Sequence, residues 1–120
     1  MWSMAQYILR FRRINRNIFT AIRDGVKKVE TRAHTTRYQR IKQGDAVMFV
    51  CGKERFKRQV KRVQHFKNIT TILRVYKLRD VNPFVSSKKE LEETYWSFPG
   101  YNEKIRKFGL IAIELTLVKR

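Results

Sequence analysis

A short segment that follows an amphipathic helix contains charged residues of both signs. The segment contains Lys27, Lys28, Glu30 and Arg32, and Gly25 before it supplies a helix stop. Because the side chains of a strand alternate between its two faces, we expect Lys28, Glu30 and Arg32 on one face, with Lys27 at the junction between turn and strand. Spacing alone favours an ordinary ladder of surface ion pairs, and the alternative is a binding or catalytic site.

Amine chemistry at Lys27 would require a pKa below the ordinary lysine value. Burial or nearby positive charge lowers a lysine pKa, and Lys28 and Arg32 are the neighbouring cations. Glu30 has a simpler interpretation, in which its carboxylate stays ionised between Lys28 and Arg32 and organises the site without reacting. Lys27 and Glu30 are therefore candidate catalytic residues, and Lys28 and Arg32 are candidate binding residues.

The remaining reactive residue types do not predict a metal or cofactor site. Two histidines, His34 and His65, and one cysteine, Cys51, are too few by themselves for a standard zinc site. The sequence also has no glycine-rich phosphate loop. His34 could approach Lys27 and Glu30 in a metal-free ribonuclease, an alternative that the sequence leaves open.

Net charge is the strongest compositional signal. The 120 residues include 28 Lys and Arg against 10 Asp and Glu, which gives a formal net charge of +18. Self-repulsion of this size favours a partner of opposite charge, and nucleic acid is the usual partner of a basic domain. Charge runs can also be solvated faces, but their clustering favours a phosphate-binding track. Its candidate residues are Lys28, Arg32, Arg37, Arg40, Arg55, Lys57, Arg58, Lys61 and Arg62.

Trp96 is the most informative of the aromatic residues that could stack on exposed bases. It lies off the apolar helix stripe formed by Leu91, Tyr95 and Phe98, so we expect it outside that packed face. The alternative is that the helix is covered on both sides and Trp96 belongs to the core. The other stacking candidates are Tyr38, Tyr95 and Tyr101.

Strands at both ends of the sequence are expected to enclose short helices. Alternating or continuous apolar patterns predict strands at 7–12, 27–33, 46–51 and 110–118. Capping residues and periodic apolar positions predict helices between Asn15 and Gly25, after Asn68, after Ser87 and over 101–108. This order favours a small mixed α+β domain over a doubly wound sheet.

Residues 55–66 have two interpretations. Phe56, Val60 and Val63 are spaced at i, i+4 and i+7, which predicts an amphipathic basic helix. The alternative is a bent strand that contains a bulge and includes Val60, Val63, His65 and Phe66. Periodicity alone leaves the choice open.

Gly25, Lys27, Glu30 and Arg32 form the pattern Gly-x-Lys-x-x-Glu-x-Arg, which resembles the signature of the ASCH domain family (activating signal cointegrator homology). The position of this pattern between a helix and a strand fits that family. The resemblance covers nearly the whole sequence, from about residue 7 to residue 118. It implies a PUA-like β-barrel of a superfamily that is rich in RNA-binding modules.

Other segments extend the resemblance. Residues 41–45 look like a second segment that matches the family, and they lead into the apolar strand at 46–51. The closing strand at 110–118 fits the family as well. The family pattern favours a strand for 55–66. It also implies a hairpin turn at 51–54 between the two middle strands.

Some small bacterial members of the family resemble acetylcytidine amidohydrolases. In those enzymes the residue at the position of Lys27 is the catalytic candidate, paired with a threonine at the position of Glu30 and with a second carboxylate after the middle strands. In this sequence Glu30 replaces that hydroxyl group, and the nearest acids, Asp80 and then Glu90, do not align cleanly. This departure weighs against that particular activity.

The sequence therefore predicts one domain over residues 1–120, with its core at about 7–118. The predicted fold is α+β, a small PUA-like mixed β-barrel of about five to six strands with short flanking helices. The predicted function is RNA binding, with one nucleotide in a cleft around Lys27, Glu30 and Arg32, and DNA is the alternative polymer. The rival prediction is a small hydrolase of a modified nucleoside, or a ribonuclease, that uses Lys27. No cofactor is expected.

The sequence predicts a cytoplasmic protein without a membrane partner. The apolar run at 47–51 is far too short to span a bilayer. The first residues lack the charged n-region of a signal peptide, and a single cysteine suits a reducing compartment. The pattern carries no information on the oligomeric state.

Overall fold

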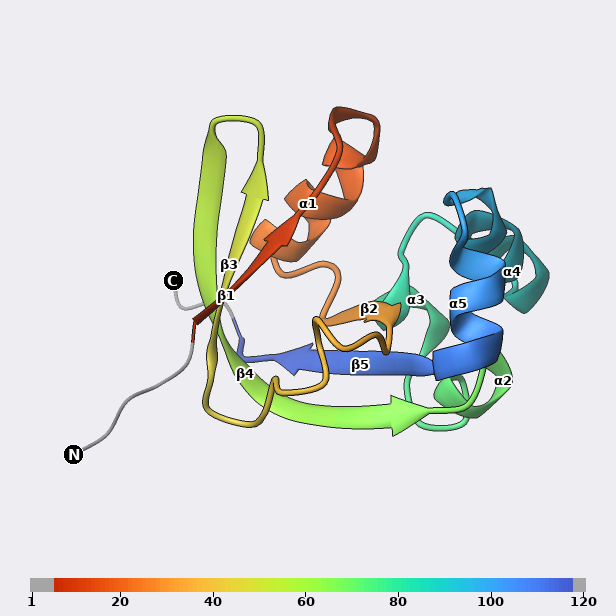
Figure 1. Ribbon diagram of the computed structural model, residues 1–120. Coiled ribbons are helices and arrows are strands. Elements are labelled where there is room, and N and C mark those ends of the chain that lie inside the picture. The colour runs from red at the N-terminus through yellow and green to blue at the C-terminus, as the bar shows by residue number, and fades with distance from the viewer. Residues whose placement is uncertain (1–5, 118–120) are drawn as a thin grey trace.

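The computed structural model describes residues 6–117, which build a five-stranded mixed sheet with short helices (Figure 1). The strands are β1 (Gln6–Arg10), β2 (Val29–Ala33), β3 (Ala46–Cys51), β4 (Glu54–Phe66) and β5 (Leu110–Leu115). The helices are α1 (Arg16–Arg23), α2 (Ile69–Ile72), α3 (Leu78–Val81), α4 (Lys88–Ser97) and α5 (Tyr101–Phe108), and a 3-10 turn, η1 (Arg13–Asn15), precedes α1.

The strands follow the order β1-β3-β4-β5-β2 across the sheet. β1 runs parallel to β3, and the other neighbouring pairs are antiparallel. Within residues 6–117 the edge strands β1 and β2 do not pair with each other, so the described sheet is open. The predicted α+β class, with a mixed sheet of five strands and short helices, is confirmed. The predicted closure of the sheet into a barrel is not observed in the described residues.

β4 is the longest strand, and it connects the two halves of the sheet. Its first half pairs with β3 and its second half pairs with β5, with a register shift between Val60 and Arg62. A shift of this kind is a β-bulge, which bends a strand. Residues 55–66 are therefore a bulged strand, and the helix alternative is wrong. Gly52 makes the hairpin turn from β3 at a φ of 60°, a left-handed conformation that favours glycine.

Two hydrophobic cores lie against the sheet, and β5 contributes to both. The first core packs α1 against β1, β3 and β4, with Leu9, Phe19 and Phe49 among its buried residues. The second core packs α2–α5 against the sheet, with Leu91 and Tyr95 among its buried residues. Alternation along β5 sends Ile111, Ile113 and Leu115 into the first core and Leu110 and Ala112 into the second.

These cores divide the molecule into two lobes. We call α1, β1, β3 and the first half of β4 the strand lobe, and we call α2–α5 the helical lobe. In Figure 1, α1 lies beside the β3–β4 hairpin, whereas α2–α5 gather at the other end of β5. Within residues 6–117, every helix is too short or too polar to cross a bilayer.

Capping side chains explain where two helices of the helical lobe begin. The hydroxyl of Ser87 accepts a hydrogen bond from the backbone N–H of Glu90 at the start of α4, and the side chain of Asn68 does the same at α2. α3 has no capping side chain, and its four residues are too few to show a helical pattern, so it was not predicted. It brings Val81 next to β2, where the Val81 carbonyl meets the side chain of Lys27.

Candidate functional site

A partly enclosed cleft of about 230 Å³ lies where the strand lobe meets the helical lobe. Its floor is formed by β2 and the segment before it, and its walls come from both lobes. The volume is below the ~300–1,000 Å³ of pockets for drug-sized ligands, so the cleft suits a small group such as one nucleobase. Residues that line it include Phe11, Arg12, Lys27, Glu30, Thr31, Arg32, Asn82, Thr94, Tyr95 and Tyr101.

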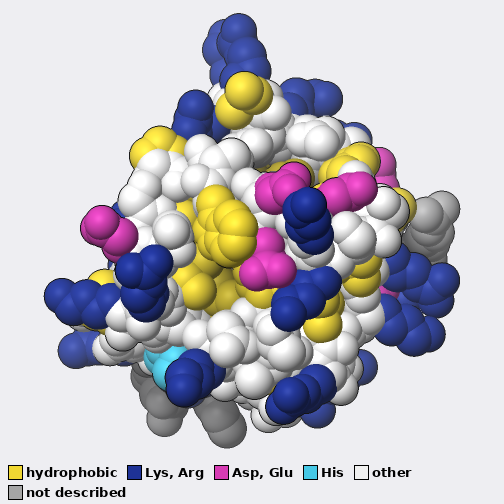
Figure 2. All heavy atoms as spheres, turned by 90° about the vertical axis from the view of Figure 1, so that its right-hand side faces the viewer, with side chains coloured by type: hydrophobic (Ala, Val, Ile, Leu, Met, Phe, Trp, Pro, Cys, Tyr) yellow, Lys and Arg dark blue, Asp and Glu magenta, His cyan; other side chains and the backbone are white. Residues whose placement is uncertain are grey.

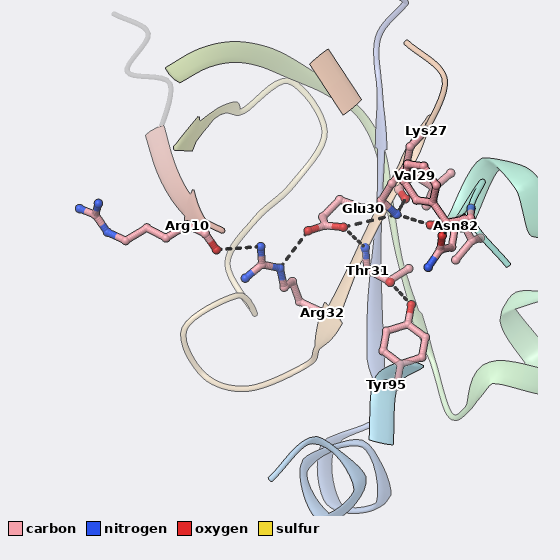
Figure 3. Close-up of polar contacts among 10 residues, drawn as sticks. Arg10, Lys27, Val29, Glu30, Thr31, Arg32, Asn82 and Tyr95 are labelled. Atoms are coloured by element: carbon pink, nitrogen blue, oxygen red, sulfur yellow. Dashed lines mark hydrogen bonds and ion pairs between the residues drawn. The ribbon is translucent and has the colours of Figure 1, made fainter. Parts of the chain in front are cut away.

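Lys27 is 3% exposed, and its ammonium group faces only oxygen atoms (Figure 3). Nζ donates hydrogen bonds to the carbonyl oxygens of Val29 and Val81 and lies 3.4 Å from Oε1 of Glu30. An ammonium group has three N–H donors and no acceptor, so these three oxygens match its full capacity. Burial lowers the pKa of Lys27, and the negative charge of Glu30 opposes this change.

Glu30 is the centre of this buried network, with 4% of its surface exposed. Its Oε1 accepts a hydrogen bond from the backbone N–H of Thr31 at 3.1 Å, and its Oε2 accepts one from Nε of Arg32 at 3.0 Å. Arg32 also donates to the backbone carbonyl of Arg10 at 3.3 Å, which links β2 to β1 (Figure 3). The carboxylate of Glu30 therefore lies between two cations, Lys27 and Arg32.

Aromatic and uncharged polar groups form the walls of the cleft. The guanidinium of Arg32 lies 4.8 Å from the centre of the Phe11 ring, a cation–π contact. The hydroxyl of Tyr95 hydrogen-bonds that of Thr31, and burial raises the pKa of Tyr95 well above its ordinary value, so this phenol stays neutral. Oδ1 of Asn82 accepts a backbone hydrogen bond, while its amide nitrogen donates none to residues 6–117. The cleft thus combines a carboxylate, a free amide and aromatic surface.

Lys28 does not share the face of Glu30 and Arg32, so the predicted three-residue face is wrong. β2 begins one residue after Lys28, and strand alternation therefore does not extend back to it. Its side chain is exposed and lines a separate shallow groove that includes Glu114. Lys27 takes the predicted place of Lys28 beside the carboxylate, because the turn out of α1 directs it inward.

Three of the predicted phosphate contacts on β4 have partners within the protein. Arg58 donates to the carbonyl oxygens of the last two residues of α1 and to that of Thr116. Lys61 and Arg62 both form ion pairs with Glu114. None of the three lines the cleft, so these predicted phosphate contacts are not part of it.

The other predicted nucleic-acid contacts are exposed but lie outside the cleft. Arg55 and Lys57 point outward from β4, and Arg37 and Arg40 belong to the loop after β2. Trp96 is 52% exposed on α4, so the alternative that placed it in the core is wrong. Among the described residues, Arg32 is the one candidate phosphate-binding cation that lines the cleft.

The two histidines lie away from the cleft, so His34 does not approach Lys27 and Glu30 as the ribonuclease alternative required. The rings of His34 and His65 pack against each other with centres 4.2 Å apart, and Nε2 of His65 hydrogen-bonds the carbonyl of Phe108 at 3.0 Å. Over residues 6–117, no group of three or more His, Cys, Asp or Glu side chains is arranged to hold a metal ion.

Several residues of the cleft, Thr31 and Asn82 among them, were not predicted as site residues. Thr31 lies inside the charged segment and could have been found from the expected strand, since β2 is buried on both faces. Asn82 follows the short helix α3, and no sequence pattern marked that helix. Tyr95 and Tyr101, which were predicted only as stacking candidates, do line the cleft.

Comparison with known proteins gives structural neighbours. No protein-family model and no curated protein matches this chain. The crystal structure of hypothetical protein PH0355 is similar over 95% of this chain and 100% of that chain, with a TM-score of 0.81 and 26% sequence identity. The solution NMR structure of protein PF0455 from Pyrococcus furiosus is similar over 97% of this chain and 100% of that chain, with a TM-score of 0.74 and 27% identity. The α+β fold is therefore shared with solved proteins that match nearly the whole length of this chain.

Proposed function

We propose that this chain is an RNA-binding domain of the ASCH type, with a PUA-like fold, that holds one nucleotide in the cleft. The observation that carries the proposal is the cleft floor, where Glu30 lies between Lys27 and Arg32 beneath aromatic walls. The same three residues, together with Gly25, resemble the ASCH signature. The net charge of +18 favours a polymeric polyanion over a free nucleoside, because a free nucleoside carries no phosphates.

The cleft offers complementary groups for a nucleobase. A carboxylate has about four lone-pair positions, and Glu30 uses three of them within the protein, so one remains for an N–H of a ligand. The amide nitrogen of Asn82 can donate to a ring nitrogen or carbonyl of the base. Phe11, Tyr95 and Tyr101 supply aromatic surface that favours a flat, π-bonded group.

Lys27 acts in this proposal as a permanent cation that fixes the floor of the cleft. A lysine must lose a proton before it can serve as a nucleophile or base. The three neighbours of Lys27 are all acceptors, so a neutral amine would turn a lone pair toward one of them. This arrangement disfavours the rival hydrolase. We expect no turnover of acetylcytidine by the purified protein, and robust turnover that is lost in Lys27→Arg would favour the hydrolase instead.

Filling the cleft tests the proposed function. Thr94 lines the cleft on α4, and Thr94→Tyr would occupy the space of a base. We expect this variant to bind nucleoside monophosphates and a short labelled RNA at least about tenfold more weakly, a loss of about 1.4 kcal/mol. Fluorescence anisotropy measures the RNA affinity, and competition by the monophosphates measures the cleft alone.

Ser97→Tyr is the matched control, because Ser97 lies on the same helix, is exposed and does not line the cleft. Its affinity should equal that of the parent protein. Equal affinities for Thr94→Tyr and Ser97→Tyr would reject the cleft as the binding site. A DNA strand of the same sequence separates RNA from DNA, because only RNA presents 2′-hydroxyl groups.

A reducing compartment such as the cytoplasm fits the proposal. Cys51, the single cysteine of the sequence, is a buried free thiol in β3. Buried thiols pack as small hydrophobic groups and are largely inert, so the fold needs no oxidising environment.

A further inference from the structure

The strand lobe has a basic outer face on the side of the sheet opposite α1. Strand alternation turns Leu9, Phe49 and Val60 toward α1 and the first core, and it turns the residues between such positions to the other side. Ile8 on this outer face is 42% exposed, although it is a large hydrophobic residue. Arg10 on the same strand is exposed as well.

Strand register arranges the outer face in rows. Arg10 of β1, Val50 of β3 and Arg55 of β4 form one row, and Ile8, Met48 and Lys57 form the next. Neighbouring strands lie about 5 Å apart and successive rows about 7 Å apart, so each row spans about 10 Å. The outer face is thus an apolar strip with cations at both margins.

The cations of this face are free, unlike those farther along β4. Within residues 6–117, which include every Asp and Glu of the sequence, Arg10, Arg55 and Lys57 form no ion pair. Lys61 and Arg62 are paired with Glu114 instead. Free clustered cations repel one another, so a polyanion on this face would relieve that repulsion.

The outer face is connected to the cleft through β1. The backbone carbonyl of Arg10 accepts a hydrogen bond from Arg32 in the cleft, while the side chain of Arg10 extends away from that contact (Figure 3). A strand of RNA with one nucleotide in the cleft could therefore continue onto the outer face at Arg10. The opposite direction, over the side of the helical lobe that faces the viewer in Figure 2, is less favourable, because hydrophobic and acidic side chains gather near the centre of that side.

We propose that this outer face binds single-stranded RNA, with phosphates on Arg10, Arg55 and Lys57 and bases against Ile8 and Met48. The inference rests on the proposed function and adds a second surface that holds the RNA next to the bound nucleotide. Single strands fit better than duplexes, because only a single strand presents its base faces to an apolar strip.

The test compares two charge-matched double variants. Arg55→Gln with Lys57→Gln removes two cations from the outer face, and Lys104→Gln with Arg106→Gln removes two exposed cations from α5. The probe is a labelled single-stranded RNA of about 12 nucleotides, within the length that small single-strand-binding domains cover. We expect about tenfold weaker binding for the outer-face pair and less than about twofold for the α5 pair. The slope of log K against log salt should fall by about 1.4 for the outer-face pair, at about 0.7 for each lost phosphate contact.

Several outcomes would overturn the inference. Equal weakening by the two pairs would show that net charge alone governs binding. A second such outcome is that polyglutamate binds as tightly as RNA and is weakened to the same extent by the outer-face double variant. That result would show that the outer face binds acidic polymers in general and not RNA in particular. If Ile8→Ser lowers the affinity for duplex and for single-stranded RNA equally, the bases do not contact the apolar strip.

The two proposals can fail separately. If Thr94→Tyr has no effect on monophosphate binding while the outer-face pair weakens the RNA, the cleft proposal is wrong and the outer face stands. If Thr94→Tyr abolishes monophosphate binding while the outer-face pair matches the α5 pair, the outer-face inference is wrong. All four substituted cations are exposed, and thermal melting should show unchanged folding for both pairs.

Discussion

The strand lobe and the helical lobe have comparable buried cores but different surfaces. Residues 1–66, which include the strand lobe, hold 17 Lys and Arg against 4 Asp and Glu, whereas residues 67–120 hold 11 against 6. Four of the later acids lie on α4 and α5, namely Glu90, Glu92, Glu93 and Glu103. The cleft lies where the two lobes meet, so its nearby positive charge comes from one lobe and most of its aromatic wall from the other. The comparison shows that neither lobe alone provides the candidate site.

The largest expected change in the free energy of unfolding comes from the buried ion network where the two lobes meet. An exposed ion pair in the strand lobe provides the comparison. Glu30→Ala leaves Lys27 and Arg32 buried beside each other without their carboxylate, which should cost about 3–5 kcal/mol in the free energy of unfolding. Glu54→Ala removes the exposed partner of Arg16 and should cost about 0–1 kcal/mol. Urea denaturation of both variants gives the two values. If both variants lose only about 0–1 kcal/mol in the free energy of unfolding, water reaches the Glu30 network between the lobes.

A smaller change in stability distinguishes a cation of β4 that is hydrogen-bonded within the protein from one that is not. Arg58 donates to the free carbonyl oxygens at the end of α1, so Arg58→Ala should lower the free energy of unfolding by about 1–2 kcal/mol. Lys57 is its exposed neighbour, and Lys57→Ala should stay within about 0.5 kcal/mol of the parent protein. Conversely, RNA binding should weaken for Lys57→Ala more than for Arg58→Ala. Interchanged results would assign the phosphate contact to Arg58.

The smallest effect concerns pH at the His34–His65 pair. Burial lowers the pKa of His34, and the neighbouring His65 lowers it further, so the folded protein binds this proton less readily than the unfolded chain. Stability should therefore fall as the pH drops through the unfolded histidine value of about 6.5 and level off below the lowered folded value. Thermal midpoints measured from about pH 7.5 to about pH 5.5 should show this fall in the parent protein. The fall should be absent in His34→Gln, and an unchanged slope there would place the titrating group elsewhere.

The position of the site could be predicted from sequence because a helix stop, a strand start and a charged cluster coincide there. Its geometry could not, because β2 begins at Val29 and not at the predicted residue 27, and this difference places Lys27 beside Glu30 where Lys28 was expected. The burial of Glu30 was not predicted either, because the sequence pattern favoured a ladder of surface ion pairs. Because Glu30 is only 4% exposed, its ion pairs belong to the buried structure and not to a surface ladder.

The fold, like the site, could be predicted only in part from the sequence. A continuous apolar run was sufficient to predict β3, and alternation was sufficient for β5. β4 satisfied both a helical and a bulged-strand pattern, since a bulge shifts apolar residues out of period two. Edge pairing is a long-range property, so no local pattern could say whether β1 and β2 would close the sheet. Asn82 was missed for a related reason, because its position depends on the contact of α3 with β2 rather than on its own neighbours.

The shared strand β5 has a consequence for the order of folding. It is the last of the described elements along the chain, yet each core is completed by one of its faces. During synthesis, α1 with its strands and the four later helices must both wait with exposed apolar surface until residues 110–115 have been made. Such late, non-local pairing favours slow folding and transient exposure to aggregation. The two lobes should then become stable together in one cooperative step, because the same strand closes both.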